Sequence, residues 1–241
     1  MKFTDSGGSN PGPTGGSNPG PTGGSNPGPT GGTDPTSAAA IAPRQLAGNA
    51  GATSVIAERR ISFGIERQQQ SDWCWAAVAV SVERYFDPAS TLEQCEIANK
   101  VIPKEYPTDP APEIDSCDHP EPYNKPADLK LALEDIHKWR TTLNRLVAAG
   151  GTIVSPGTLT FEAIRQEIDR GRPICAAISW YSGGGHFVVL SGYRMLGSGA
   201  RQVYVQDPLN PSALVDLDEF SFAYYGDGEW TATHLVRNDL N

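Results

Sequence analysis

Repeats of glycine and proline at the N-terminus limit how much of the chain can fold. Residues 7–30 are three copies of GGSNPGPT, and a degraded copy follows at 31–35. Glycine enlarges the unfolded ensemble, proline removes backbone donors, and the repeat has no apolar side chain that would offset the entropy of ordering. We therefore predict a disordered tether, rich in Gly, Pro, Ser and Asn, which with a transition segment covers residues 1–52. Residues 53–241 are long enough for one domain with its own core.

The pattern of apolar residues beyond this tether changes from helical to strand-like. A short strand at 59–65 comes first. Four helices are then predicted, at 74–86, 91–102, 126–138 and 160–170. Five strands follow, at 174–180, 186–193, 202–207, 213–217 and 229–236. Helices followed by strands that are joined by short turns predict an α+β fold with a mostly antiparallel sheet and a cleft where the two layers meet.

Residues near the predicted helix ends carry capping signals. Asp72 lies just ahead of the first helix and is placed to cap its free amides. Thr91 and Gln94 resemble a capping box for the second helix, and Pro126 suits the first turn of the third. Long loops are expected at 103–125 and 148–158.

Composition and charge exclude several classes of partner. The formal net charge is −9, and an acidic domain repels phosphate backbones and anionic lipids, so we expect no nucleic-acid binding. No apolar run approaches the ~20 residues that a helix needs to cross a bilayer, so we expect no membrane span. Residues 1–5 lack the apolar region of a secretory signal. The protein then stays inside the cell, leaves by a route without that signal, or has lost a leading segment. We expect a monomer.

Cys74 combines the features of a reactive thiol. It stands between Trp73 and Trp75, after a polar turn and at the head of a dense apolar helix. The thiolate is the nucleophilic form of cysteine, and the positive end of a helix dipole favours it. A nearby imidazole could take the thiol proton and form a thiolate–imidazolium pair. The alternative is that Cys74 is a small buried apolar residue of the helix.

His186 and Asp207 supply an imidazole and a carboxylate further along the chain. His186 follows three glycines, which leave room for a substrate backbone, and it opens a strand. If this strand and the next form an antiparallel hairpin, the partner of His186 falls near residue 210, close to Asp207. Asp207 could then orient the imidazole, as the carboxylate of a triad does. The alternatives are a structural histidine and a turn aspartate before Pro208, with Asn210 as another orienter.

Gln68 is the candidate for a donor to an oxyanion. It lies six residues before Cys74, where its amide could reach back beside the nucleophile and act together with the Cys74 backbone N–H. The two glutamines that follow it are more simply polar loop residues. Aromatic residues also flank the set, since Trp180 and Tyr181 precede His186 and could either line the cleft or belong to the core.

Five segments of the chain together resemble the papain-like cysteine peptidases. They are QQQSDWCWAAVAVSVERY, LEQCEIAN, GRPICAAISW, GGGHFVVLSGY and VYVQDP. The resemblance covers about residues 59–237 and is closest to the AvrRpt-type bacterial effector proteases, with the bacteriocin leader peptidases as more distant relatives. Plant-type papains differ, because they carry small residues and a second cysteine just before the nucleophile, where this chain has Asp72 and Trp73.

The resemblance implies a papain-like fold in which a helical lobe carries Cys74 and a sheet lobe carries His186 and Asp207. It implies hydrolysis of peptide bonds through an acyl-enzyme. Cys74 would be the nucleophile, His186 the general base and acid, Asp207 the orienter and Gln68 the oxyanion donor. The partner would be a protein or peptide substrate, and no cofactor or metal is implied. With the N-terminus, the resemblance fits an effector or toxin that is delivered without a signal peptide.

The other three cysteines have separate interpretations. Cys175 lies in an apolar strand and is most simply a core residue. Cys95 and Cys117 could form a disulfide that pins the loop at 103–125, or both could be free thiols. The same loop holds four residues that could bind a metal, Cys117, Asp118, His119 and Glu121. Their spacing fits no strong ligand pattern.

Two other functions are compatible with this set of residues. A thiol acyltransferase or deamidase with transglutaminase-like chemistry also uses cysteine, histidine and aspartate in this order. An inactive protease scaffold could serve as a binding module. The strands after His186 and the glutamine before Cys74 favour the peptidase, and the intact set of four candidate residues argues against the inactive scaffold.

Overall fold

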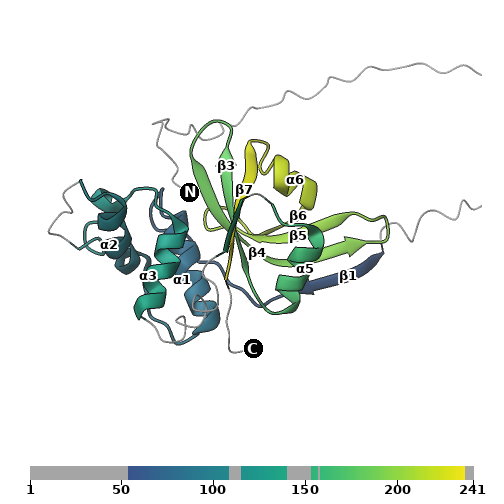
Figure 1. The fold of residues 1–241 in the computed structure, drawn as a ribbon, viewed down its shortest axis with the longest axis horizontal. Helices are drawn as coiled ribbons and strands as arrows, with labels where there is room; N and C mark the ends of the chain where they lie inside the picture. Colours follow the sequence, from purple (N-terminus) through teal and green to yellow (C-terminus); the bar gives the residue numbers. More distant parts are fainter. Residues whose placement is uncertain (1–53, 109–114, 140–152, 157, 237–241) are drawn as a thin grey trace, which may run out of the picture. The chain divides into compact units, whose positions relative to one another are not determined.

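The computed structural model describes residues 54–108, 115–139, 153–156 and 158–236 (Figure 1). The predicted tether and transition segment at 1–52 lie outside these residues, as do parts of the two predicted loops. Within the described ranges, every helix is too short or too polar to cross a bilayer.

The strands form one sheet in which neighbouring strands are antiparallel. They are β1 (Val55–Arg60), β2 (Ile153–Pro156), β3 (Ile174–Trp180), β4 (Gly185–Leu196), β5 (Arg201–Gln206), β6 (Ala213–Asp216) and β7 (Gly228–Leu235). Their order is β2-β7-β3-β4-β5-β6, and β1 pairs with β4. β4 is therefore central, and its residues from His186 to Tyr193 are all buried.

The helices form a group of three and two single helices. They are α1 (Cys74–Phe86), α2 (Gln94–Glu105), α3 (Leu129–Trp139), α5 (Phe161–Asp169), α6 (Leu217–Phe222) and the 3₁₀ helix η1 (Glu121–Tyr123). The helices α1, α2 and α3 pack on one another, and α1 also contacts β4 (Figure 1). Every residue of α1 from Cys74 to Glu83 is buried, because the other helices and the sheet surround it. The predicted α+β fold is confirmed.

The prediction of a strand at 59–65 is wrong. β1 covers Val55–Arg60, where it pairs with the second half of β4. Its side chains are almost all exposed, so backbone pairing sets its position and no apolar alternation marks it in the sequence. Ile61 and Phe63, which suggested the strand, are buried after it has ended.

The N-cap position of α1 is occupied by Trp73 and not by Asp72, and the Trp73 side chain makes no capping hydrogen bond. The Asp72 backbone N–H donates to Oδ1 of Asn124 at 3.0 Å. This bond ties the turn before α1 to the segment before α3.

The second and third helices begin later than predicted. α2 starts at Gln94, and its capping box is formed by Glu93 and Glu96 and not by Thr91 and Gln94. The Gln94 side chain instead bonds the backbone of the segment that precedes α1. α3 starts at Leu129 and not at Pro126. Three elements were not predicted: η1 lies within the expected loop at 103–125, β2 lies within the expected loop at 148–158, and α6 follows β6 directly.

Candidate active site

Cys74 is the first residue of α1, and the tryptophans on both sides of it hold a neighbouring segment. The indole N–H of Trp73 donates to the Tyr123 carbonyl at 2.9 Å, and that of Trp75 donates to the Lys125 carbonyl at 3.1 Å. Both indoles are buried, whereas Cys74 is 8% exposed and forms no disulfide. The WCW sequence therefore anchors the backbone around Cys74 and leaves the sulfur at the edge of a pocket.

The pocket lies between three segments of the chain. The turn before α1 and the start of that helix contribute Ser71, Asp72, Cys74 and Trp75; the segment before α3 contributes Pro126 and Ala127; and the start of β4 contributes Gly185, His186 and Phe187. The thiol and the imidazole that the sequence singled out therefore line the same pocket, although they are far apart in the chain.

A glycine turn brings His186 to the start of β4. Gly183 and Gly184 have φ angles of 103° and 81°, in the left-handed region that favours glycine. The turn is closed by a hydrogen bond from the Gly183 N–H to the Trp180 carbonyl at 3.0 Å. His186 then pairs with Ile178 of β3 and is 4% exposed. The glycines thus shape the turn that places the imidazole.

His186 and Asp207 meet at the open end of the hairpin formed by β4 and β5. The imidazole Nε2–H donates to Oδ1 of Asp207 at 2.7 Å. The register of the two strands continues to a partner at residue 209 for His186, next to the predicted position. Since β5 ends at Gln206, Asp207 leaves the ladder, and its carboxylate is free to turn toward the imidazole.

The imidazole of His186 lies between the Asp207 carboxylate and the Cys74 sulfur. Burial by itself would lower the pKa of His186, but its hydrogen bonds to Asp207 and Cys74, with their negative charges, raise it to about 10. Burial likewise would raise the pKa of Asp207, but the bond to His186 and its charge lower it to about 2. Because Nε2 bonds Asp207, Nδ1 is the nitrogen available to Cys74. The arrangement therefore favours a protonated imidazole between the Cys74 sulfur and the Asp207 carboxylate.

The Asp207 carboxylate is held from several sides. The backbone N–H groups of Leu209 and Asn210 donate to Oδ1 at 2.8 and 3.1 Å. The Asn210 amide and the Tyr224 hydroxyl donate to Oδ2 at 3.1 and 2.9 Å. These four donated hydrogen bonds favour the ionised form of the carboxylate. Asn210, the alternative orienter, thus bonds the carboxylate that meets His186.

The Gln68 side chain lies outside the pocket. Its Nε2 group donates to the carbonyls of Gln70 and Ser71 at 2.9 and 2.7 Å, and it is not among the pocket residues. Its Oε1 is buried without a hydrogen-bond partner in the described part of the chain. The Gln68 backbone N–H donates to the Pro208 carbonyl at 2.9 Å, so this segment is tied to the residue after Asp207.

The sequence did not point to Tyr224, and it did not decide whether Trp180 lines the cleft or belongs to the core. Trp180 lies against the His186 imidazole, with ring centroids 6.1 Å apart and planes at 24°. Tyr224 bonds Asp207, but it stands between an unpredicted helix and a glycine turn, so no local pattern signals the contact. Tyr181 is 66% exposed.

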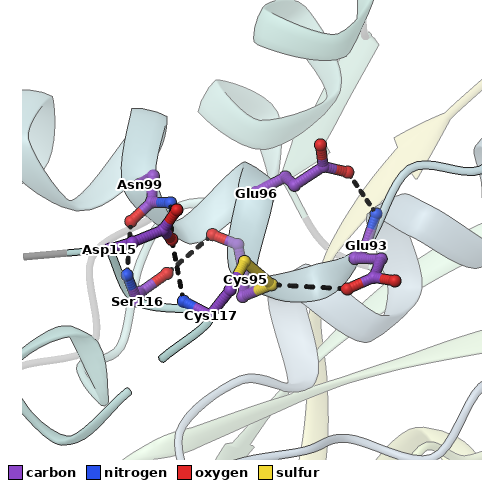
Figure 2. Close-up of a disulfide and its surroundings, with 7 residues drawn as sticks. All are labelled: Glu93, Cys95, Glu96, Asn99, Asp115, Ser116 and Cys117. Atoms are coloured by element: carbon purple, nitrogen blue, oxygen red, sulfur yellow. Dashed lines mark hydrogen bonds between the residues drawn. A yellow bond between two sulfur atoms is a disulfide. The ribbon is translucent and has the colours of Figure 1, made fainter. Parts of the chain in front are cut away.

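A disulfide fastens the segment that forms one wall of the pocket. Cys95 of α2 and Cys117 are bridged, with Cα atoms 4.9 Å apart (Figure 2). Beside the bridge, the Ser116 hydroxyl donates to the Cys95 carbonyl at 2.7 Å. The Asn99 amide donates to Asp115 at 2.6 Å. Of the two alternatives for these cysteines, the structure contains the bridge. Cys175, predicted in the core, is completely buried.

The bridge also changes the metal hypothesis for this loop. The one cluster of potential metal ligands among the described residues is Glu93, Cys95 and Cys117. Two of its ligand atoms are disulfide sulfurs, which lack the thiolate that binds metals. Glu93 Oε2 lies 3.6 Å from the Cys95 sulfur (Figure 2), and because a disulfide sulfur carries no proton, we interpret this as a van der Waals contact.

Comparison with known proteins agrees with this geometry. A family model described as the Peptidase_C39 like family matches residues 60–234. The matched range runs from the last residue of β1 almost to the end of β7 and contains Cys74, His186 and Asp207. No curated protein matches the chain. The family match supports a cysteine peptidase of papain-like type, and because it covers most of the chain, the protein belongs to the Peptidase_C39 like family.

Proposed function

We propose that this protein is a cysteine endopeptidase that cleaves protein or peptide substrates with Cys74 as its nucleophile. The observation that carries the proposal is the shared pocket of Cys74 and His186, in which Asp207 holds the other nitrogen of the imidazole. All three groups come from one chain, so we propose that a monomer is sufficient. The proposed steps use no cofactor.

Acylation comes first. The Cys74 sulfur attacks the carbonyl carbon of the scissile amide, and the C–N bond breaks as the imidazolium of His186 gives its proton to the leaving amine. A thioester then joins the acyl part of the substrate to Cys74. His186 next takes a proton from water, and the resulting hydroxide attacks the thioester. The acid leaves, the thiolate returns, and Asp207 keeps the imidazole in one tautomer and orientation throughout.

The oxyanion of these steps needs donors close to Cys74. The first backbone amides of a helix have no acceptor within the helix, so the N–H of Cys74 at the start of α1 is suited to this role. Gln68 is the proposed second donor. Since its amide now bonds the carbonyls of Gln70 and Ser71, it would have to exchange these partners when a substrate binds.

The proposed branch within this class is that of the AvrRpt-type effector proteases. The support is the similarity of the segments around Cys74, His186 and Asp207 to that branch. An effector of this kind would act on proteins of a target cell after delivery.

The pH dependence of Cys74 alkylation tests the proposal without a known substrate. At pH 6, a thiol with an ordinary pKa of ~8.5 is less than about 1% thiolate, so labelling of Cys74 by iodoacetamide should exceed that of a free thiol by at least about tenfold. Cys175 is an internal control, because burial raises its pKa to about 12. Peptide mapping by mass spectrometry distinguishes the two cysteines.

The variant His186→Ala decides between the outcomes. Loss of the fast labelling at pH 6 in this variant supports the thiolate–imidazolium pair. Slow labelling of the wild-type protein, rising only toward the pKa of an ordinary thiol, would contradict the proposed peptidase and favour an inactive scaffold that binds a partner.

A further inference from the structure

The Asp207 carboxylate has a second buried partner on the side away from His186. The Tyr224 hydroxyl donates to Oδ2 at 2.9 Å, whereas the imidazole donates to Oδ1 at 2.7 Å. Tyr224 is 3% exposed. Burial and the negative charge of Asp207 both raise the pKa of Tyr224 above its ordinary value. The phenol therefore keeps its proton and acts as a fixed donor to one carboxylate oxygen.

The indole of Trp180 lies against both the Tyr224 ring and the His186 imidazole. Trp180 lies nearly parallel to the His186 imidazole, and also to the Tyr224 ring, with centroids 6.3 Å apart and planes at 17°. Phe220 packs edge-on against Tyr224 at 5.2 Å. The phenol and the imidazole therefore bond the same carboxylate and contact the same indole, which restricts the movement of each ring.

The backbone turn after Tyr224 is built to hold this arrangement. Tyr225 has a φ of 51°, a left-handed conformation that is unfavourable for a bulky residue and that often marks functional sites. Two backbone hydrogen bonds, of 2.8 and 2.9 Å, join Tyr224 to Gly228. A Cβ atom on Gly228 would lie 2.7 Å from the indole of Trp180. The lack of a side chain there lets Trp180 lie where it meets both rings.

We infer that Tyr224 is a positioning residue, which acts through Asp207 to keep the His186 imidazole aimed at Cys74. This inference rests on the proposed function. Without the hydroxyl, the Asn210 amide would be the one donor left to Oδ2 among the described residues. The carboxylate would then be held less firmly, and its bond to His186 would be formed for less of the time. The imidazolium would then be less stabilised, and so would the thiolate that it pairs with.

The variant Tyr224→Phe tests the inference, because it removes the hydroxyl and keeps the ring contacts. We expect Cys74 alkylation at pH 6 to slow by about tenfold, the effect typical of one hydrogen bond to a charged group. The acid limb of the pH profile should move to higher pH. The reason is that the Cys74 thiol loses its proton only at a higher pH when the imidazolium that stabilises the thiolate is held less firmly. An effect on folding alone would lower the melting temperature and leave this limb in place.

Tyr193→Phe is the matched control. Tyr193 is also buried, and its hydroxyl also donates to a carboxylate, that of Asp169 at 2.9 Å, but this pair lies outside the pocket. We expect a normal alkylation profile for this variant. An unchanged profile in Tyr224→Phe, with a fast wild-type reaction, would overturn the positioning role alone. A slow wild-type reaction would overturn the proposed function as well.

A double-mutant cycle shows whether Tyr224 acts through Asp207. If it does, Tyr224→Phe should have no further effect on alkylation in an Asp207→Ala background, because the group that it positions is gone. Equal effects of Tyr224→Phe with and without Asp207 would show an independent role and contradict the inference.

Discussion

Two histidines are buried in one sheet, and their neighbours give them opposite preferences for a proton. At His186 on β4, the effect of burial is outweighed by Asp207 and Cys74, which raise the pKa to about 10. At His234 on β7, burial dominates and lowers the pKa to about 4. His234 packs edge-on against Phe187, and neither of its ring nitrogens has a hydrogen-bond partner among the described residues. A partner of opposite charge thus decides whether a buried imidazole is charged.

His234 should make the fold sensitive to acid. Its pKa is about 4 in the folded state against 6.5 for a free imidazole. The unfolded chain therefore binds the proton first as the pH falls from 6.5 to 4, and over this range the free energy of unfolding should drop by about 3 kcal/mol. In His234→Leu this part of the drop should disappear. Urea unfolding at pH 7.5 and 4.5 gives the free energy of unfolding of the wild-type protein and of the variant.

The comparison needs a histidine outside the core. His119 is exposed, so His119→Gln should keep the acid sensitivity of the wild-type protein. The same loss of stability between pH 7.5 and 4.5 in His234→Leu and in the wild-type protein would show that other groups cause it.

Among the elements, the pocket wall depends on attachments that are far apart in the sequence. We call the segment from Asp115 to Ala127 the wall segment. The bridge to Cys95 holds its beginning, and the indoles on both sides of Cys74 hold its second half. The Asn124 side chain adds bonds to the turn before α1. The wall segment has little regular structure beyond η1, so these attachments set its position.

Removal of the bridge should loosen this wall. The bridged cysteines are 22 residues apart, and a loop of this length predicts that the double variant Cys95→Ala/Cys117→Ala loses about 3 kcal/mol of unfolding free energy. We also expect faster hydrogen exchange in the wall segment and at the Asp72 amide, which donates to Asn124. Urea unfolding and hydrogen exchange with mass spectrometry measure the two effects.

A reductant provides the control for this experiment. It should destabilise the wild-type protein to the level of the double variant and leave the variant unchanged. Equal stability of the oxidised wild-type protein and the variant would mean that the indole and Asn124 bonds are sufficient to hold the wall.

The sequence predicts an element well when the element has an apolar pattern of its own. The helix at 74–86 and the strand at 174–180 have the predicted bounds, since each is a dense apolar run with polar or glycine residues beside it. β1 and β2 were misplaced or missed because their positions depend on backbone pairing with β4 and β7. α6 is short and begins directly at the end of β6, so no loop marks its start.

On the scale of the whole molecule, the candidate site joins the group formed by α1, α2 and α3 to the sheet. Cys74 comes from the first and His186 and Asp207 from the second. The Gln68 N–H donates to the Pro208 carbonyl, so the segment before Cys74 is bonded to the residue after Asp207. The relative position of thiol and imidazole therefore depends on the packing of α1 against β4.

The N-terminal repeats should be dispensable for catalysis. The family match begins at residue 60, and every pocket residue lies beyond residue 70. We expect a chain without residues 1–36 to keep the wild-type rate of Cys74 alkylation and of peptide hydrolysis. A chain without residues 1–60 is the contrasting variant: it lacks β1, which pairs with β4, and should unfold at lower temperature. Loss of activity on removal of 1–36 would show that the repeats belong to the site.

The sequence also predicted which residues of the candidate site meet, within limits that have a physical cause. Cys74, His186 and Asp207 could be singled out because each stands at the end of a recognisable element. The placement of Tyr224 on Asp207 and the pocket lining by Pro126 and Ala127 arise from tertiary contacts that leave no local pattern. Gln68 was predicted beside the nucleophile, but two nearby carbonyls take its amide.

The Cys95–Cys117 bridge has a consequence for experiments that look for cuts in the chain. It closes the backbone between these positions into a covalent ring. A single cut within 96–116, whether by the protein itself or by an added protease, leaves the two pieces linked. On a non-reducing gel such a nicked molecule keeps its full mass, and only reduction separates the fragments. Self-processing at this ring would thus be undercounted in any sample that has not been reduced.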